Sequence, residues 1–142
     1  MSYEFARLEM LIGENGIQKL KGSSVAIFGI GGVGSYSAET LARSAVGKII
    51  LVDFDKISES NINRQIHSLK STVGLNKAEV MGERIKDINP ECEVIKEINL
   101  LKENNIKEFF EKHNPDFVID AIDMVKTKAM LIEYCSQNNI NI

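Results

Sequence analysis

The sequence predicts an α/β protein with a Rossmann-like, doubly wound and mainly parallel sheet, helices on both faces, and short helices preceding it. Short unbroken apolar runs, typical of buried parallel strands, alternate with segments of helical periodicity. A glycine cluster at residues 29–34 stands directly between the first apolar run and the helical segment after it. The next apolar run ends in an acid, Asp53. These three observations together are typical of nucleotide-binding sheets.

The first half of the chain predicts a βαβ unit behind two amphipathic helices. Its expected elements are helices over about 3–11 and 13–21, a strand over 25–28, a helix over 35–46 ended by Gly47, and a strand over 48–53. Two strands joined by a helix in this way form a parallel pair with a right-handed crossover.

The second half continues the alternation. Its expected elements are a helix over 77–89 stopped by Pro90, a weaker strand over 93–98, a helix over 104–113 with Ile106, Phe109 and Phe110 inward, a strand over 117–122, and a helix over 125–138. Residues 140–142 resemble the start of another strand. We therefore expect residues 1–142 to be one nucleotide-binding domain and a carboxy-terminally truncated fragment.

Composition indicates an ordinary globular chain. With 142 residues it is about one domain, and 44% apolar with 26% charged residues is typical of a soluble protein. No apolar run is long enough to span a membrane and the first ten residues do not form a signal peptide, so we expect a cytoplasmic protein. A net charge of -3 disfavours an autonomous nucleic-acid binder. Cys92 and Cys135 are too isolated to indicate a disulfide framework or a zinc site.

The glycine cluster predicts a phosphate site. It reads G-x-G-G-x-G through Gly29, Gly31, Gly32 and Gly34, which permits a tight turn and close approach of backbone to phosphate. The helix that follows presents unpaired N–H groups and its positive dipole end to the anion. Asp53, about twenty residues on, stands where a carboxylate accepts hydrogen bonds from ribose hydroxyls. A purely structural strand-turn-helix is the alternative interpretation.

Three charged residues favour ATP over a nicotinamide cofactor. Arg64 and Lys77 follow the second strand, where they could reach a triphosphate, and Asp123 follows the strand over 117–122 on the same edge of the sheet. A carboxylate there could hold Mg²⁺ bridging phosphate oxygens. Taken singly, each cation fits a solvated position as well, and His67 fits a packing role better than that of a base. An NAD-dependent oxidoreductase and a non-catalytic nucleotide-binding module stay open as alternatives.

The motifs GIGGVG, VDFD, SNINRQ, VGLNK and VIDAID, in this order, resemble the adenylating superfamily of ubiquitin-activating enzymes and bacterial activators of sulfur-carrier proteins. Within it, the segments FARLEMLIGENG, INRQIHSL and ERIKDINPECEV are most similar to the tRNA threonylcarbamoyladenosine dehydratase branch. The resemblance implies an ATP-dependent adenylating enzyme: a carboxylate oxygen attacks the α-phosphorus of ATP, pyrophosphate leaves, and a second nucleophile traps the acyl-adenylate. The 142-residue chain alone is expected to be inactive.

The resemblance also implies roles for individual residues. It places Gly31 and Gly32 against the nucleotide, Asp53 at the ribose, Asp55 and Asn61 in the pocket wall, Arg64 and Lys77 at the phosphates, and Asp123 at the magnesium ion. Arg7 corresponds to an arginine that enters the site of the neighbouring protomer, which implies a homodimer. Met124 stands where the sulfur-carrier activators usually have Asn or another small polar residue, so this chain departs from their pattern beside Asp123.

Two acyl substrates follow from the resemblance. In the dehydratase branch the carboxylate is that of the threonyl group on a modified tRNA adenosine, whose carbamoyl group then closes a ring with loss of AMP. In the sulfur-carrier branch it is the terminal glycine of a carrier protein. The acidic balance mildly disfavours RNA, unless the binding residues lie in the missing carboxy-terminal part or form a patch from Lys102, Lys107, Lys112, Lys126 and Lys128.

Overall fold

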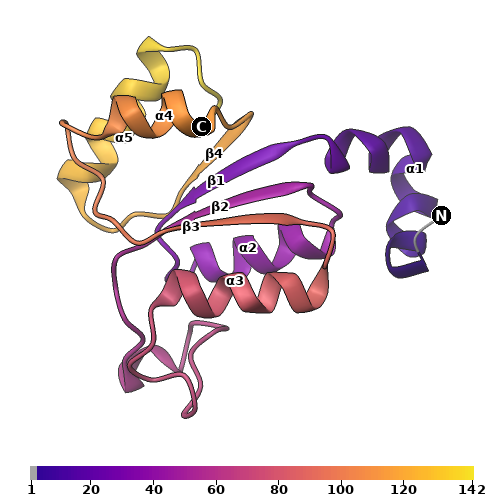
Figure 1. The fold of residues 1–142 in the computed structure, drawn as a ribbon, viewed down its shortest axis with the longest axis horizontal. Coiled ribbons are helices and arrows are strands. Elements are labelled where there is room, and N and C mark those ends of the chain that lie inside the picture. Colours follow the sequence, from indigo (N-terminus) through magenta and orange to yellow (C-terminus); the bar gives the residue numbers. More distant parts are fainter. Residues whose placement is uncertain (1–2) are drawn as a thin grey trace.

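The structure, a computed structural model that describes residues 3–142, confirms the predicted class. Its single sheet has four strands in the order β3-β2-β1-β4, and every neighbouring pair is parallel (Figure 1). The strands are β1 (Ser24–Phe28), β2 (Lys48–Val52), β3 (Glu93–Glu97) and β4 (Phe117–Asp120). Because β1 lies between β2 and β4, the winding direction of the chain reverses beside it. A crevice for a ligand is expected at the carboxyl ends of these strands.

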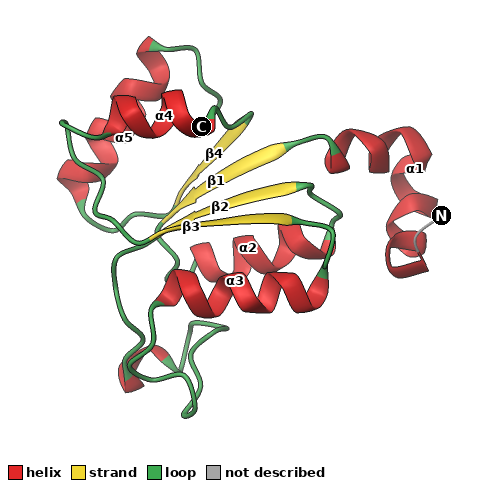
Figure 2. Cartoon of the chain, viewed as in Figure 1, coloured by secondary structure: helices red, strands yellow, loops and turns green. Residues whose placement is uncertain are grey.

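Two pairs of helices cover the two faces of the sheet, as Figure 2 shows. On one face lie α2 (Gly34–Arg43) and α3 (Lys77–Ile88), and on the other lie α4 (Ile106–His113) and α5 (Val125–Gln137). Apolar side chains of each strand alternate between the two layers, so that Ile27 and Leu51 pack toward the first pair of helices, while Ala26 and Ile50 pack toward the second. The sheet is thus buried on both faces, which explains its unbroken apolar strands.

The amino-terminal helices are two helical pieces, as predicted. A 3-10 turn, η1 (Tyr3–Phe5), leads into α1 (Ala6–Lys21), and Gly13 interrupts α1 with a φ of 75°. The helix α1 lies beyond the amino ends of the strands, at the opposite end of the sheet from the glycine turn (Figure 1). Across residues 3–142, no helix is long and apolar enough to cross a membrane.

The helix α2 ends earlier than its sequence predicts. Periodicity suggested an end at Val46 followed by Gly47, but the last helical residue is Arg43 and Ala45 adopts a left-handed φ of 64°. Ala45 packs with Phe5 and Ile17, so a tertiary contact ends the helix. Gly47 is needed for a different reason, because a methyl group there would collide with the Lys21 carbonyl oxygen.

The remaining boundaries agree with the prediction to within two residues, because the apolar pattern of each element is local. The last strand stops at Asp120, since the Asp120 carboxylate turns back to accept the N–H of Ile122 (3.1 Å). Asn141 forms a parallel bridge with Phe117, and its carbonyl accepts the N–H of Val118 (2.8 Å). The expected strand character of residues 140–142 is confirmed at this bridge.

An ion-pair cluster ties α2 to α3 and so fixes the two elements that carry the glycine turn and Lys77. Arg84 of α3 donates from Nε to Glu39 of α2 (2.5 Å), and Arg43 pairs with the same carboxylate (2.7 Å). Burial alone would raise the pKa of Glu39, but the hydrogen bonds from Arg84 and Arg43 outweigh it and lower the pKa. The carboxylate is therefore held ionised between the two helices.

Candidate nucleotide site

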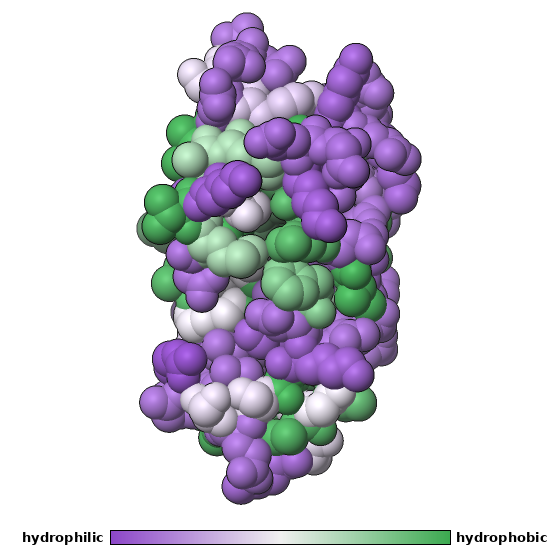
Figure 3. Space-filling view, turned by 90° about the vertical axis from the view of Figure 1, so that its left-hand side faces the viewer, coloured by the Kyte–Doolittle hydropathy of each residue, from purple (hydrophilic) through white to green (hydrophobic). Residues whose placement is uncertain are grey.

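A cleft of about 330 Å³ opens at the carboxyl ends of β1, β2 and β4, where the topology predicts it. Figure 3 shows this end of the molecule, with a band of apolar residues crossing between polar surfaces. The predicted site residues that line the cleft are Gly29, Gly31, Gly32, Asp53, Asp55, Arg64, Lys77 and Asp123. Residues more than 90 positions apart in the sequence are therefore brought to one site.

The glycine turn is shaped by both backbone conformation and close packing. Gly29 has a φ of 89°, and a side chain there would collide with the Ala121 carbonyl oxygen at the end of β4. Gly34 begins α2 and is buried behind the turn, where a methyl group would collide with the Gly29 carbonyl. Gly31 and Gly32 lie between them on the cleft surface. The turn can thus bring its backbone close to an anion.

Asp53 organises the turn that it faces. One carboxylate oxygen accepts the N–H of Ile30 (2.6 Å) and the other accepts the N–H of Asp55 (2.7 Å). The residue is 9% exposed and lines the cleft. Each carboxylate oxygen has a second lone pair, so the group can still accept a hydrogen bond from a ligand hydroxyl. Asp53 therefore has a structural task that the sequence did not indicate, beside its predicted ribose contact.

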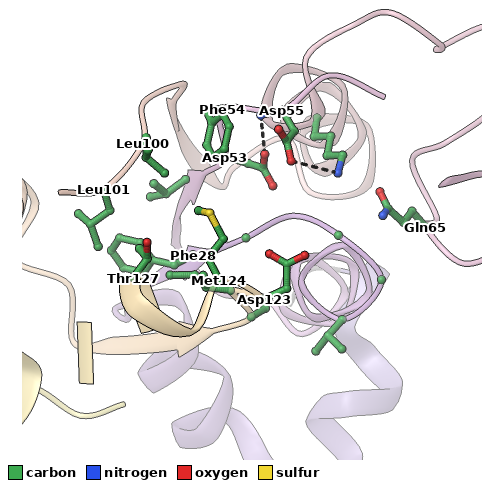
Figure 4. A pocket seen from close by; sticks show the side chains of 18 of the residues that line it. Phe28, Asp53, Phe54, Asp55, Gln65, Leu100, Leu101, Asp123, Met124 and Thr127 are labelled. Carbon is green, nitrogen blue, oxygen red and sulfur yellow. Dashed lines mark hydrogen bonds and ion pairs between the residues drawn. The ribbon is translucent and has the colours of Figure 1, made fainter. Parts of the chain in front are cut away.

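The two predicted phosphate contacts have different surroundings. Lys77 is the first residue of α3 and is 7% exposed, with its ammonium group 3.8 Å from the Asp55 carboxylate. Arg64 is exposed and its side chain lies along Gly32, while Nη1 donates to the Ser60 carbonyl (2.7 Å). In Figure 4 a dashed line joins Asp55 to the ammonium group of its ion-pair partner. Both cations stand at the cleft, one fixed by burial and one near its mouth.

Asp123 stands on the other wall of the cleft and is exposed. Figure 4 shows its carboxylate directed toward the glycine turn, with Met124 beside it. Asp120, by contrast, is engaged within the fold, since it accepts hydrogen bonds from Ile122 N–H and from Lys128 Nζ (2.6 Å). The two acids at this strand end therefore differ in role: Asp120 shapes the chain, and Asp123 faces the cleft.

His67 has the packing role that its sequence context favoured. Its Nε2 lies 2.6 Å from the Ile30 carbonyl and its Nδ1 lies 3.1 Å from the Ser68 hydroxyl. Because a carbonyl can only accept, Nε2 carries the proton and Nδ1 accepts from Ser68. Burial lowers the pKa of His67, which keeps the ring neutral. The ring fastens the crossover segment to the glycine turn.

Three predicted site residues do not line the cleft: Gly34, which is buried behind the glycine turn, Asn61 and Arg7. Asn61 is buried, and its side-chain oxygen accepts the N–H of Ser58 (2.9 Å) at the short helix η2 (Glu59–Asn61). It supports the segment that carries Arg64 from behind. Arg7 is exposed on α1, at the far end of the sheet (Figure 1). Within one chain, Arg7 is therefore not part of this cleft.

Sequence reasoning missed the apolar wall of the cleft and three of its polar residues, Gln65, Asn99 and Thr127. Phe54, Leu100 and Leu101 form a surface suited to a flat apolar group such as a base (Figure 4). Phe54 lies within the VDFD motif, but its apolar role was not predicted, and Leu100 and Leu101 belong to no motif, so only the fold reveals this wall. Gln65 was missed because it adjoins the more conspicuous Arg64. Within residues 3–142 there is no cluster of three or more His, Cys, Asp or Glu side chains that could hold a metal ion. The Cys92 thiol is buried, and this burial raises its pKa to about 11.

Comparisons with known proteins agree with this geometry. The ThiF family model matches residues 5–142. A tRNA threonylcarbamoyladenosine dehydratase from Bacillus subtilis is 48% identical over 140 residues, 99% of this chain and 55% of the relative, and one from Escherichia coli is 46% identical over 96% of this chain and 50% of the relative. The crystal structure of the Escherichia coli dehydratase in complex with ATP superposes with a TM-score of 0.94 at 45% identity, covering 97% of this chain and 56% of that one.

The chain thus spans about half the length of the curated relatives it matches. The family match extends over nearly all of it and includes every element that forms the cleft. The chain belongs to the ThiF family.

Proposed function

We propose that the full-length protein adenylates a carboxylate at the expense of ATP, and that this carboxylate is the threonyl group of threonylcarbamoyladenosine in tRNA. The observation that carries the proposal is one cleft in which a glycine turn meets Asp53, Lys77 and Asp123. A relative with the same fold, 45% identical, was crystallised with ATP, and its name states the dehydration of this nucleoside.

The cleft supplies a separate surface for each part of a nucleotide. Phe54, Leu100 and Leu101 offer an apolar wall for the base, and the free lone pairs of Asp53 can accept from ribose hydroxyls. The glycine turn, with Arg64 and Lys77, provides donors and positive charge for the phosphates. Such charge stabilises the developing negative charge as pyrophosphate departs. The cleft therefore suits transfer at phosphorus better than hydride transfer.

The residues present also fit a magnesium ion. Mg²⁺ prefers oxygen ligands and is usually bound by one or two carboxylates together with substrate phosphates and water. Asp123 provides one exposed carboxylate at the cleft, so phosphate oxygens of the nucleotide would complete the set. When bound, the ion neutralises phosphate charge. Met124, 40% exposed beside it, adds no oxygen ligand.

Arg7 leads us to include a homodimer in the proposal. It lies on α1, away from its own cleft, and this helix exposes Met10 (79%) and Leu11 (81%). Exposed apolar side chains on one helix favour burial against a partner. In a dimer each site would combine Arg7 of one protomer with Asp123 of the other.

Subunit exchange tests this arrangement. Full-length Arg7→Ala and Asp123→Ala are each expected to be nearly inactive. An equimolar, randomly exchanged mixture should recover about a quarter of wild-type activity, because half of the dimers are mixed and each has one intact site. A mixture that stays inactive after confirmed exchange would refute a site shared between protomers, and full activity of Arg7→Ala alone would make Arg7 an ordinary surface cation.

The tRNA surface is less sharply defined. Among the lysines considered for it, Lys112 pairs with Glu97 (3.0 Å), Lys128 with Asp120 (2.6 Å) and Lys107 with Glu111 (3.7 Å). Internal neutralisation weakens this patch as an RNA-binding surface.

The function is tested with the full-length protein, ATP, magnesium and tRNA that carries threonylcarbamoyladenosine. We expect the nucleoside to become lighter by one water, with pyrophosphate and AMP formed in equal amounts. Replacing ATP by NAD should abolish the conversion. If pyrophosphate forms only when a carrier protein with a terminal glycine replaces the tRNA, the sulfur-carrier activity is the correct one.

A further inference from the structure

Gln65 is a buried polar residue in the cleft whose hydrogen-bonding capacity the fold leaves unused. Its side chain is part of the cleft wall, and the residue is 6% exposed. Its side-chain oxygen Oε1 is the one buried side-chain N or O atom within residues 3–142 that has no hydrogen-bond partner. An unpaired buried amide costs free energy that an apolar side chain of similar size would avoid. Such a group needs an explanation in a native protein.

The main chain holds this amide firmly at the glycine turn. Gln65 donates its N–H to the Asn61 carbonyl (3.0 Å), and its own carbonyl accepts the N–H of Ser68 (3.0 Å). The side-chain nitrogen Nε2 lies beside Gly31, 3.6 Å from where a Cβ of that residue would be. Figure 4 shows the carboxamide directed toward the turn from the side opposite Leu100 and Leu101. The amide thus stands at the phosphate end of the cleft.

We propose that Gln65 is a phosphate-binding residue of this site: its Nε2 donates a hydrogen bond to a phosphate oxygen that lies on the Gly31–Gly32 turn. The inference rests on the proposed binding of ATP. Phosphate oxygens accept and do not donate, so they pair with the Nε2 hydrogens and not with Oε1. The unpaired Oε1 matters because no bond from it to the fold fixes the orientation of the carboxamide. The terminal torsion of a glutamine is soft, which lets an unbonded carboxamide turn its donors toward the ligand.

A neutral donor at this position complements the two cations. Lys77 is already paired with Asp55, and Arg64 donates to Ser60 and to Asn63 Oδ1 (2.8 Å). Gln65 would add a directional hydrogen bond without adding charge, and this bond would fix the position of the phosphate. The contact would be made by AMP and ATP but not by adenosine.

The experiment compares three ligands on full-length variants by calorimetry. Gln65→Met should lower affinity for ATP and AMP about 10- to 100-fold, the value of one hydrogen bond to a charged group, and leave adenosine affinity unchanged. Its Tm without ligand should stay equal or rise, because the unpaired amide is gone. Gln65→Glu keeps the shape but adds negative charge, so it should weaken ATP and AMP further. Gln18→Met, on the exposed surface of α1, is the matched control.

The outcomes separate this inference from the function on which it rests. If wild type binds ATP and both Gln65 variants bind it equally well, Gln65 has no ligand role and the inference is wrong. A lower Tm of Gln65→Met with unchanged phosphate binding would show a structural role and overturn it too. If the wild-type protein binds no adenine nucleotide, both the function and the inference fail. Gln65→Glu keeps the test decisive should Gln65→Met not fold.

Discussion

The two ends of the sheet treat their polar groups in opposite ways. At the amino end, Asp116 accepts both the N–H (2.7 Å) and the hydroxyl (3.0 Å) of Ser24, and its own N–H donates back to that hydroxyl (3.0 Å). At the carboxyl end, Asp123 and Gln65 face a cleft, and the Gln65 oxygen has no partner within residues 3–142. Polar groups that hydrogen-bond to each other stabilise the fold, whereas polar groups that face a cavity without a partner indicate a ligand.

This contrast predicts which polar residues affect stability and which affect ligand binding. Polar groups at the amino end already have their hydrogen bonds, so removing them costs stability and spares binding. Asp123 and Gln65, which face the cleft, are expected to contact a ligand, so replacing them should weaken binding or catalysis and leave stability unchanged. Four substitutions, given in order of decreasing effect, test this assignment of residues to stability or to binding.

Gly47→Ala is expected to have the largest effect and to act on stability alone. The added methyl group collides with the Lys21 carbonyl at the amino end of the sheet, and such overpacking costs about 3 kcal/mol of unfolding free energy. Urea unfolding measures this, with Gly22→Ala as the control, since a Cβ at Gly22 meets its nearest atom at 3.5 Å. Weaker ATP binding by the folded fraction of Gly47→Ala would contradict this assignment.

Asp123→Asn in the full-length protein should lower the rate of pyrophosphate formation about 100-fold or more, because charge neutralisation at the phosphates matters most as pyrophosphate departs. Its unfolding free energy should not change, since Asp123 is exposed. Asp116→Asn, at the other end, is the matched control: it should lose stability and keep the rate. A wild-type rate for Asp123→Asn would refute the role given to this carboxylate.

Asp53→Ala should affect both properties, because Asp53 belongs to both categories. It removes the acceptors of the Ile30 and Asp55 N–H groups, for which we expect a loss of about 2 kcal/mol of unfolding free energy. Affinity for ATP, AMP and adenosine should fall by a similar factor, since all three carry the ribose. Calorimetry beside urea unfolding measures both quantities. A variant that loses only one of them would assign Asp53 to a single role.

The smallest effect concerns pH. The pKa of His67 is lowered below its usual 6.5 by burial, so below that pH the unfolded chain takes up a proton that the folded chain does not. Stability should therefore fall as pH decreases from about 6.5 toward the lower pKa of the folded state. Urea unfolding of His67→Gln should show a flatter pH dependence than wild type. Equal slopes would mean that His67 is not the titrating group.

Much of the fold was predictable because its patterns are local. The run 25–28, the glycines and Asp53 define a βαβ unit within thirty residues, and the structure has that unit. The end of α2 was wrong because Ala45 packs against Phe5 and Ile17, a contact that no local pattern encodes. Periodicity finds the faces of helices, while distant contacts decide where they stop.

The site was predictable where residue type and position agree. Lys77 and Asp123, whose charge and position predicted a site at this edge of the sheet, line the cleft. Asn61 was placed in the pocket wall by resemblance, and its capping contact with Ser58 appears only in three dimensions. Gln65 lies in the SNINRQ motif, but the sequence does not show that its side chain is buried with an oxygen that has no hydrogen-bond partner.

The position of β1 between β2 and β4 has a consequence for how the cleft is assembled. The glycine turn and Asp53 belong to the β1–α2–β2 unit, whose residues are close together in the sequence. Asp123, in contrast, is brought to the cleft by the pairing of β4 with β1, in which Val25 lies opposite Phe117. The entropy of closing that long loop is lost once, when the domain folds. The two walls then face each other before any nucleotide arrives, and the ligand meets a gap whose width the sheet has already set.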